Sequence, residues 1–464
     1  MPAAPARRPV GIAQPAAALA AADEERLRRY ATALALSEGP PPAGAGRRDE
    51  PRLSLNYARA LVRKTAAYVF PGPVTFRTPP GAGPPAAAAR AETALAALVA
   101  DLDLAALDVG LCMDAAVLGD AAVKITWDAR AAAPLVVPVD PATLAVGAAA
   151  DDPRRMLTAT QRYGLPPTRL RELGWLAAGH EPPHDAPLEI VERWTPARWQ
   201  VEVAGQLVRD EANPYGWLPY VVLPNAPRPH QFWGESDLID LGDLCHEIER
   251  RVGVLSRVLD LSGAPIAVLE NVDGADGIGV RPGAVWELPE GARAYLLDLL
   301  SGGGAELHVR YLDLLFRALH DLSETPRTAF GDAGRNLSGA ALEVEVQPLL
   351  QKVARKRRGW DAFYRERNTR LLDLLERHGG QPLGGVRRTE AIWPSVLPSD
   401  VDGAVRNAAL LVREGIHSRR TAIATLGGAD PDGEFARVRH EAAAIAAPGP
   451  LAPAAPSSEE ERAP

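Results

Sequence analysis

Apolar positions recur along most of this 464-residue chain at the spacings of helices and strands. In the first half, helical spacing covers residues 24–37, 55–69 and 86–117. Strand-like alternation falls between and after these helices, over residues 72–77, 121–127, 135–139, 189–194, 199–203 and 218–223. This mixture predicts an α+β module over residues 23–235.

The second half of the chain has mostly helical spacing. Its helices are expected over residues 236–262, 305–322, 338–378, 400–426 and 432–446. Short strands at 266–270 and 284–288 separate the first two helices, and a glycine-rich turn region over 273–283 lies between these strands. The fold class predicted for the whole chain is α+β.

Individual residues further define where the helices of the second half begin or bend. Ser236 stands where a helix N-cap is favoured, and Asp237 and Asp240 then lie near the positive end of the helix. Pro348 must kink the long third helix or mark its first turn, because proline lacks an amide donor.

Composition sets limits on the class of protein. Hydrophobic residues make up 47% of the chain, enough for a sizeable core, whereas residues 1–22 and 447–464 are rich in Pro and Ala and are expected to be disordered. Two cysteines, Cys112 and Cys245, exclude a disulfide framework and are typical of small core residues in a reducing environment. No apolar run approaches the roughly 18 to 20 residues that span a bilayer, and no signal peptide is expected.

The motifs of common enzyme classes are absent. Gly302–Gly304 is followed by Ala305 and Glu306, so the lysine and hydroxyl of a P-loop are missing. His180 and His184 are separated by two prolines that forbid a regular helix, which favours an exposed loop over a metal-binding pair. We therefore predict no catalytic residues, no metal site, no cofactor and no enzyme activity.

Charge is distributed unevenly. The net charge is −8, and residues 236–324 carry 16 Asp and Glu against seven Lys and Arg. This acidic region opens with Asp237, Asp240, Asp243 and Glu247. A basic cluster follows in the third helix, formed by Lys352, Arg355, Lys356, Arg357 and Arg358. Such a cluster is typical of a solvated face or of salt bridges to another subunit, and phosphate contact is the alternative.

Several short motifs follow the α+β module in a definite order. They are Gly234-Glu235-Ser236-Asp237-Leu238, Pro282-Gly283-Ala284-Val285-Trp286-Glu287, Glu324-Thr325-Pro326, Phe330-Gly331, Asn336-Leu337-Ser338-Gly339-Ala340-Ala341-Leu342, Trp393-Pro394, Gly415-Ile416-His417-Ser418-Arg419 and Leu426-Gly427. In this order and spacing the chain resembles the portal proteins of tailed bacteriophages, of the siphophage head-to-tail connector type, from about residue 55 to about residue 445.

The resemblance implies a portal-like architecture with an α+β wing, a two-helix stem, a small β clip, a long crossing helix and a helical crown. It assigns an N-terminal arm to residues 1–22, the wing to 23–235, the stem helices to 236–262 and 305–324, the clip to 263–304, a tunnel loop to 325–338, the crossing helix and wing return to 339–399, the crown to 400–446 and a disordered tail to 447–464.

The resemblance also implies a function. Portal proteins form a ring, normally a dodecamer, at one capsid vertex of the virion, and terminase pumps double-stranded DNA through it. The implied partners are other copies of the chain, terminase, a head-completion or adaptor protein and the major capsid and scaffolding proteins, with assembly in the bacterial host cytoplasm and no membrane. The tunnel-loop residues expected nearest to DNA are Arg327, Phe330, Asp332, Arg335 and Asn336.

An acidic stem would agree with this role, because it would let DNA slide without being held. Two alternatives remain open. One is a magnesium-dependent DNA-processing enzyme that uses Asp237, Asp240 and Asp243 as ligands. The other is a different head-tail connector or capsid structural protein.

Overall fold

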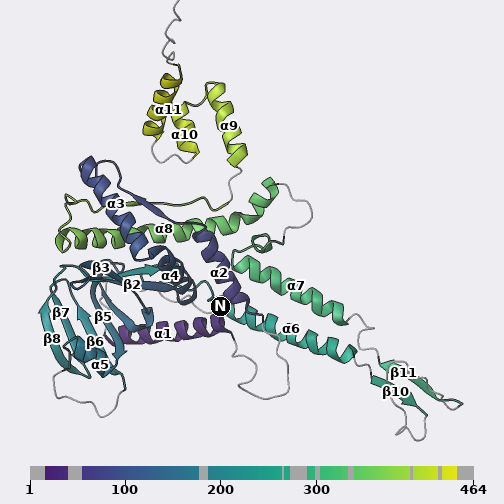
Figure 1. The fold of residues 1–464 in the computed structure, drawn as a ribbon. Coiled ribbons are helices and arrows are strands. Elements are labelled where there is room, and N and C mark those ends of the chain that lie inside the picture. Colours follow the sequence, from purple (N-terminus) through teal and green to yellow (C-terminus); the bar gives the residue numbers. More distant parts are fainter. Residues whose placement is uncertain are drawn as a thin grey trace, which may run out of the picture. The chain divides into compact units, whose positions relative to one another are not determined.

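The computed structural model describes residues 16–39, 55–176, 186–263, 266–271, 290–297, 304–332, 339–397, 401–426 and 431–446. Helices and strands both occur, which confirms the predicted α+β class (Figure 1). The chain divides into two compact units, Met1–Pro394 and Ser395–Pro464. Among the helices that the structure describes, none is both long enough and apolar enough to cross a lipid bilayer. The loop predicted around His180 and His184 lies outside the described residues.

Four helices precede the sheets: α1 (Ala16–Glu38), α2 (Tyr57–Val69), α3 (Pro85–Asp101) and α4 (Leu104–Leu118). Since α1 begins at Ala16, the predicted disorder of residues 1–22 is wrong for residues 16–22. The helical region predicted over 86–117 is divided in two, because Asp103 has a left-handed backbone conformation with φ of 45°. Cys112 is buried in α4, as expected of a core residue.

Antiparallel strands form two larger sheets in the first unit, one with the order β3-β2-β9 and one with the order β4-β5-β6-β7-β8. The strands are β2 (Asp120–Asp128), β3 (Ala133–Val139), β4 (Leu144–Ala148), β5 (Met156–Leu165), β6 (Leu188–Trp194), β7 (Arg198–Val203), β8 (Gln206–Ala212) and β9 (Tyr220–Pro224). The sequence pattern does not predict β4, β5 or β8. In β5 and β8 most side chains are exposed or half-buried, so their apolar and polar positions do not alternate.

Shorter elements complete the sheet region. The 3-10 helix η1 (Pro141–Thr143) connects β3 to β4, and α5 (Pro167–Glu172) covers the apolar side of the five-stranded sheet through Leu170. The short strand β1 (Thr75–Arg77) pairs with β12 (Glu390–Ile392), which joins the first third of this unit to its end.

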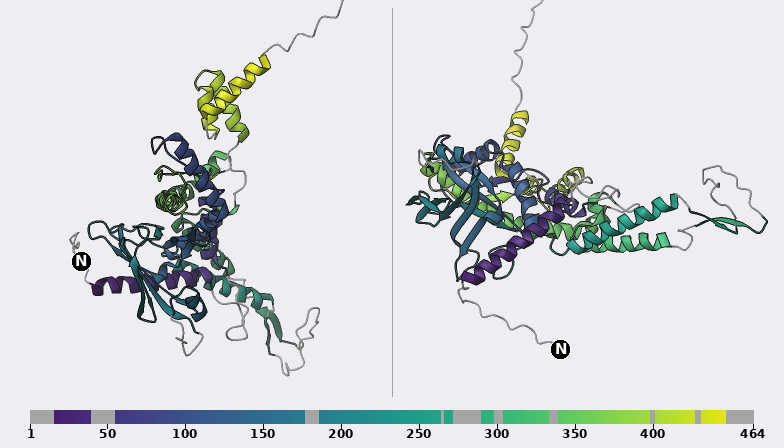
Figure 2. Two further views of the ribbon diagram at one scale, coloured as in Figure 1. Left: turned by 60° about the vertical axis from the view of Figure 1, so that its left-hand side comes forward. Right: turned by 90° about the horizontal axis from the view of Figure 1, so that it is seen from below.

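Two antiparallel helices follow the sheets, α6 (Gly242–Gly263) and α7 (Gly304–Leu322), and they lie side by side (Figure 1 and the right-hand view of Figure 2). The predicted helix start at Ser236 is wrong, because residues 238–241 form turns and α6 begins at Gly242. Between the helices, β10 (Ile266–Glu270) pairs with β11 (Arg293–Leu297), a strand that the pattern does not predict. The strand and turn region predicted over 273–288 lie outside the described residues.

The 3-10 helix η3 (Arg327–Phe330) leads from α7 toward α8 (Gly339–Arg377), which confirms the long helix predicted there. Pro348 lies beyond the first turn of α8, so of the two predicted placements only a position inside the helix remains. Buried side chains anchor α8 in the first unit: Arg367 pairs with Asp108 of α4 at 2.7 Å, and Tyr364 donates to the same carboxylate.

The second unit contains α9 (Val401–Arg413), α10 (Arg419–Thr425) and α11 (Pro431–Ala446). The prediction over 432–446 is confirmed by α11, whereas the single helix predicted over 400–426 is divided into α9 and α10. Ser418 caps α10 by accepting a hydrogen bond from the Thr421 amide. Apolar side chains in this unit are mostly exposed: Val405, Leu410, Ile416, Leu426 and Val438. Among the described residues of this unit, Ala408 is the one buried apolar side chain, so the unit has little core of its own.

Candidate functional site

The first turns of α6 and the last turns of α7, here called the bases of the two helices, pack into one hydrophobic core. Leu312, Leu315 and Leu319 recur at helical spacing on α7 and pack in the same cluster as Ile248 of α6. This cluster also takes in Leu61 and Val62 of α2, Ala116 of α4 and Ala33 of α1. The two helices are therefore fixed at their bases by apolar packing against three other helices.

The four acidic residues predicted at the start of the first long helix do not form one group. Asp237 precedes α6 and its side chain is only 12% exposed, whereas Asp240 and Asp243 are exposed. Glu247 in α6 pairs with Arg250 and Arg251, each at 2.7 Å. Because α6 begins at Gly242, Asp237 and Asp240 do not lie in its first turn, and helical spacing does not place them on one face with Asp243.

The two helices are also less acidic than expected. α6 carries four acidic residues and three arginines, and α7 carries three acidic residues and two arginines. The connection between the helices holds the largest share of the acid excess in residues 236–324, because residues 264–303 carry six Asp and Glu against two Arg. The acidity was predicted to be concentrated in the two helices and in the β module between them, and this is corrected for the helices, whose charges are nearly balanced.

Asp237 lies between two lysines of α8. Its Oδ2 is 2.8 Å from Lys356 Nζ and 3.4 Å from Lys352 Nζ, and Asn225 donates to its Oδ1 at 2.8 Å. Burial alone would raise the pKa of Asp237, but the ammonium groups of Lys356 and Lys352 and the hydrogen bonds outweigh it and hold the pKa at about 2. Burial and the neighbouring Lys356 lower the pKa of Lys352, with Asp237 opposing them. The carboxylate is thus ionised and neutralised within the chain.

The basic cluster of α8 is largely used inside the chain. Lys352 and Lys356 contact Asp237, and Arg355 forms an ion pair with Glu324. Arg357 donates to the carbonyl oxygens of Val69 and Pro394 and lies over the ring of Trp393, 4.7 Å from its centroid. Arg358 is exposed. Contact of the cluster with phosphate or with a neighbouring subunit stays a prediction, and Arg358 is the member whose exposure suits it best.

Three of the five predicted tunnel-loop residues lie close together around η3. Arg327 Nε is 3.1 Å from Asp332 Oδ2, and both side chains are exposed. Phe330 is 39% exposed. Gly331 ends η3 with φ of 90°, which a residue with a side chain rarely adopts. Arg335 and Asn336 lie outside the described residues.

Phe330 has two neighbours that sequence reasoning missed. Its ring meets the His320 ring edge-on, with centroids 5.8 Å apart, and Lys64 Nζ of α2 lies 5.3 Å from its centroid. No sequence signal links Lys64 to this segment, because α2 lies far from η3 in the chain. The structure thus adds a lysine from α2 to the candidate site.

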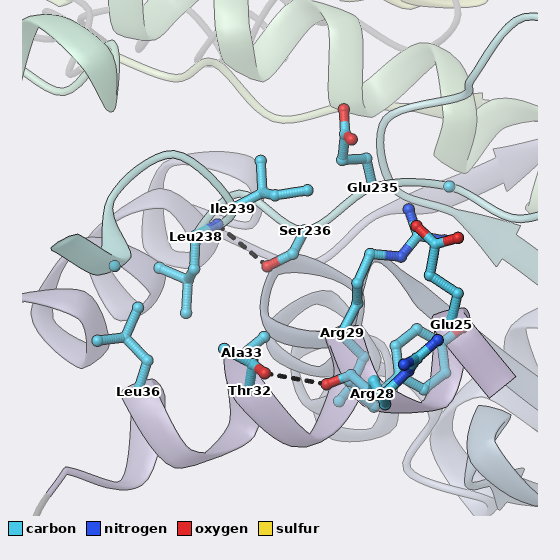
Figure 3. A pocket seen from close by; sticks show the side chains of 14 residues that line it. Glu25, Arg28, Arg29, Thr32, Ala33, Leu36, Glu235, Ser236, Leu238 and Ile239 are labelled. Atoms are coloured by element: carbon cyan, nitrogen blue, oxygen red, sulfur yellow. Dashed lines mark hydrogen bonds between the residues drawn. The ribbon is translucent and has the colours of Figure 1, made fainter.

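A pocket of about 230 Å³ lies between α1 and residues 234–242 (Figure 3). Arg28 and Arg29 of α1 line it together with apolar side chains such as Leu36 and Leu238. Of the predicted site residues, none lines this pocket.

A second side of α7 also exposes leucines. Leu307 is 70% exposed, and Leu314 and Leu322 are each 59% exposed. Leu307 and Leu314 share one side of the helix, turned away from the buried Leu312, Leu315 and Leu319, whereas Leu322, the last residue of α7, lies nearly in line with Leu315. A helix that is apolar on two faces is typical of one that packs against a further partner.

Comparison with known proteins supplies one match. The family described as “Phage portal protein, SPP1 Gp6-like” matches residues 307–447, a range that includes most of α7, η3, α8 and the helices of the second unit. Several of the motifs that carry the resemblance lie inside this range, whereas those at 234–238 and 282–287 precede it. No curated protein matches the chain.

Proposed function

We propose, on the premise that this chain is a tailed-phage portal protein, that it forms a ring-shaped channel at one capsid vertex through which double-stranded DNA is packaged and ejected. The observation that carries this proposal is the family match over residues 307–447. In this function the protein is a passive conduit, and a separate terminase ATPase supplies the energy.

The proposed roles follow the elements in chain order. The α+β region is the wing, α6 and α7 are the stem, and the β10–β11 pair belongs to the clip that docks terminase and later the head-completion protein. Residues 325–338 form the tunnel loop, α8 crosses the wing, and α9 to α11 form the crown. Capsid and scaffolding proteins would surround the ring in the assembling particle.

Closure of a ring requires side-to-side contacts between different surfaces of neighbouring subunits. The exposed leucines of α7 and the exposed apolar side chains of the second unit support such contacts, because both are surfaces that a free subunit would leave in water. We propose that both surfaces are covered by neighbouring copies of the chain.

Passage of DNA requires that the channel wall does not hold phosphate groups. Each lysine or arginine that binds a phosphate releases counterions, and many such contacts together would trap DNA. The nearly balanced charges of α6 and α7 support a channel that DNA passes without adhesion. Arg327, Phe330 and Asp332, with Arg335 and Asn336, are proposed to lie nearest to DNA.

The magnesium-dependent enzyme has less support than the portal. Its three proposed ligands would have to share one site, but Asp237 is held by Lys352 and Lys356 while Asp240 and Asp243 are exposed. A carboxylate that already neutralises two ammonium groups is a poor ligand for a further cation.

Native mass spectrometry with negative-stain imaging tests the proposal on the purified chain at moderate salt without nucleotide. We expect a closed ring of about twelve subunits with a central hole. A monomer or dimer would contradict the portal proposal, and cleavage of DNA with magnesium would favour the enzyme. An assembly without a central channel would favour another head-tail structural protein.

A further inference from the structure

One buried polar cluster joins three segments that are far apart in the sequence. It contains Asp237 just before α6, Ser323 just after α7, Lys352 and Lys356 of α8, and Asn225 after β9; we call it the Lys352 cluster. The side chains of Asp237 and Lys352 are each 12% exposed, and that of Lys356 is 7% exposed. Solvent therefore contributes little to keeping these charges stable.

Lys352 is the member that touches both ends of the helix pair. Its ammonium group donates to the Ser323 carbonyl oxygen at 3.0 Å and lies 3.4 Å from Asp237 Oδ2. Ser323 follows the last turn of α7, and Asp237 precedes the first turn of α6. One side chain of α8 thus holds the entry to one helix and the exit from the other.

The turn that Lys352 holds leads directly into η3. Thr325 in this turn is fully buried, and its hydroxyl donates to the same Ser323 carbonyl oxygen at 3.0 Å. His320 Nδ1 lies 2.7 Å from the Thr325 carbonyl oxygen. Glu324 has a φ of 51°, a left-handed backbone conformation that residues other than glycine rarely adopt. A strained turn of this kind persists only when its surroundings hold it.

The charges make these contacts interdependent. If the end of α7 moved away from α8, Lys352 would lose a hydrogen-bond acceptor in a buried place, and if Asp237 moved away, two ammonium groups would face each other without a counter-charge. The Arg355–Glu324 pair also links the turn to α8, but both side chains are nearly half exposed, so this pair contributes little.

We infer that Asp237 and Lys352 are positioning residues that hold the start of α6 and the end of α7 to α8, so that η3 keeps a fixed place relative to the helix pair. The inference rests on the proposed function, because it is there that η3 gains its role next to DNA. In that role, the cluster keeps η3 in place while DNA moves past it.

Hydrogen–deuterium exchange of the full-length protein tests this inference, with wild type and variants compared in the same state of assembly. Lys352→Met keeps the apolar stem of the side chain but removes the charge and the hydrogen bond. We expect it to raise exchange about tenfold both in residues 320–332 and in residues 236–246, with little change in the strands of the sheets. Lys352→Arg should restore part of the protection, because it can still donate to Ser323 and pair with Asp237.

Two control variants change charged residues near Lys352 and Asp237 that do not belong to the Lys352 cluster. Arg358→Met removes an exposed cation from α8, and Asp240→Asn removes an exposed acid close to Asp237; both should leave exchange unchanged. A rise confined to residues near 352, or an equal rise in the controls, would overturn the inference.

A triple variant separates the positioning of residues 320–332 from the stability of the whole protein. Replacing all three buried charges by apolar groups, as Asp237→Leu with Lys352→Met and Lys356→Met, should restore much of the melting temperature, since buried ion pairs are often replaceable by apolar packing. Residues 320–332 should nevertheless stay unprotected, because the hydrogen bond to Ser323 is gone. Full recovery of their protection would contradict the inference. These contacts lie within one chain, so failure of the wild type to form rings would count against the proposed function alone.

Discussion

Asp120 is a fully buried carboxylate that ties α1 to the segment before α6. Its Oδ1 accepts from the Gly234 amide at 2.8 Å, and its Oδ2 accepts from the Tyr30 hydroxyl. Arg26, beside Tyr30, donates to the Pro141 carbonyl oxygen at 2.8 Å. Burial raises the pKa of Asp120 to about 7, because the hydrogen bonds and the nearby Arg26 and Arg29 offset only part of the desolvation.

A raised pKa means that the folded protein binds this proton more tightly than the unfolded chain does. The stabilising contribution is therefore present below about pH 4 and is lost as the pH rises through about 7. Asp120→Asn keeps a neutral side chain at every pH. We expect its stability relative to wild type to improve by on the order of 1 to 3 kcal/mol between pH 5 and pH 8. Thermal unfolding of both proteins across this pH range measures the change. A stability difference that stays constant with pH would contradict the raised pKa of Asp120.

The turn between β7 and β8 has an unfavourable residue. Ala204 and Gly205 have φ values of 48° and 80°, as in the two-residue hairpin turn that favours Asn-Gly. Alanine pays a steric cost in this conformation, so Ala204→Asn should stabilise the protein by about 0.5 to 1 kcal/mol in denaturant unfolding. Gly205→Ala is the matched control. It should destabilise through backbone strain alone, because a Cβ there would meet no other atom within 4 Å. Gains from both variants would contradict this reading of the turn.

At the residue scale, the sequence identified which polar residues matter but not which residues they contact. It singled out Ser236 and Asp237 but assigned them to a helix start. In the structure the Ser236 hydroxyl donates to the Val117 carbonyl oxygen and accepts from the Leu238 amide, which caps a turn instead. The lysines that hold Asp237 follow it by more than a hundred positions. No local pattern contains that information, so burial of the carboxylate was beyond prediction.

At the element scale, α7 is the helix whose surface most requires a partner. We expect Leu307→Glu with Leu314→Glu to weaken ring assembly, because each subunit would then place two charges in an apolar contact. The fold of the subunit should be unaffected, since both side chains are exposed in the single chain. Native mass spectrometry and thermal unfolding measure the two effects separately.

The matched control is Leu207→Glu on the edge strand β8, where the leucine is 55% exposed. A ring that survives the α7 variant, or one that the control disrupts equally, would contradict the assignment of α7 to a contact between copies.

Long helices with apolar positions at helical spacing were predicted nearly residue for residue, as α7 and α8 illustrate. The errors lie where local pattern is weak. The break between α3 and α4 depends on one left-handed residue, Asp103, within an alanine-rich stretch. The strand β11 pairs with the predicted β10, but its sequence, Arg-Ala-Tyr-Leu-Leu, has no alternation of apolar and polar residues that would identify it.

At the scale of the whole molecule, charge balance is the property that matters most for a DNA conduit. The overall excess of acid excludes general adhesion to phosphate, and the helix pair is close to neutral. The order of motifs indicated a resemblance to portal proteins from the sequence alone, but which acids are neutralised locally, such as Asp237 and Glu247, required the three-dimensional contacts.

This balance leads to a test of whether the helix pair lines the path of DNA. Asp243 on α6 and Asp313 on α7 are both exposed. Asp243→Lys with Asp313→Lys adds four units of positive charge per subunit, which a ring multiplies. If these helices line the channel, assembled rings of the variant should retain linear double-stranded DNA about tenfold or more above wild type at 50 mM salt, with most of the gain lost at 200 mM as counterions compete. Filter binding across that salt range measures both effects.

The control carries the same change in charge at exposed acids outside the helix pair, Asp101→Lys with Glu172→Lys. If adhesion depended only on the net charge of the ring, both variants would retain DNA equally, and the proposed position of α6 and α7 along the channel would be wrong. If only charges on the channel wall retain DNA, the control should stay near wild type, because charges more than a Debye length from the DNA, about 14 Å at 50 mM salt, are largely screened.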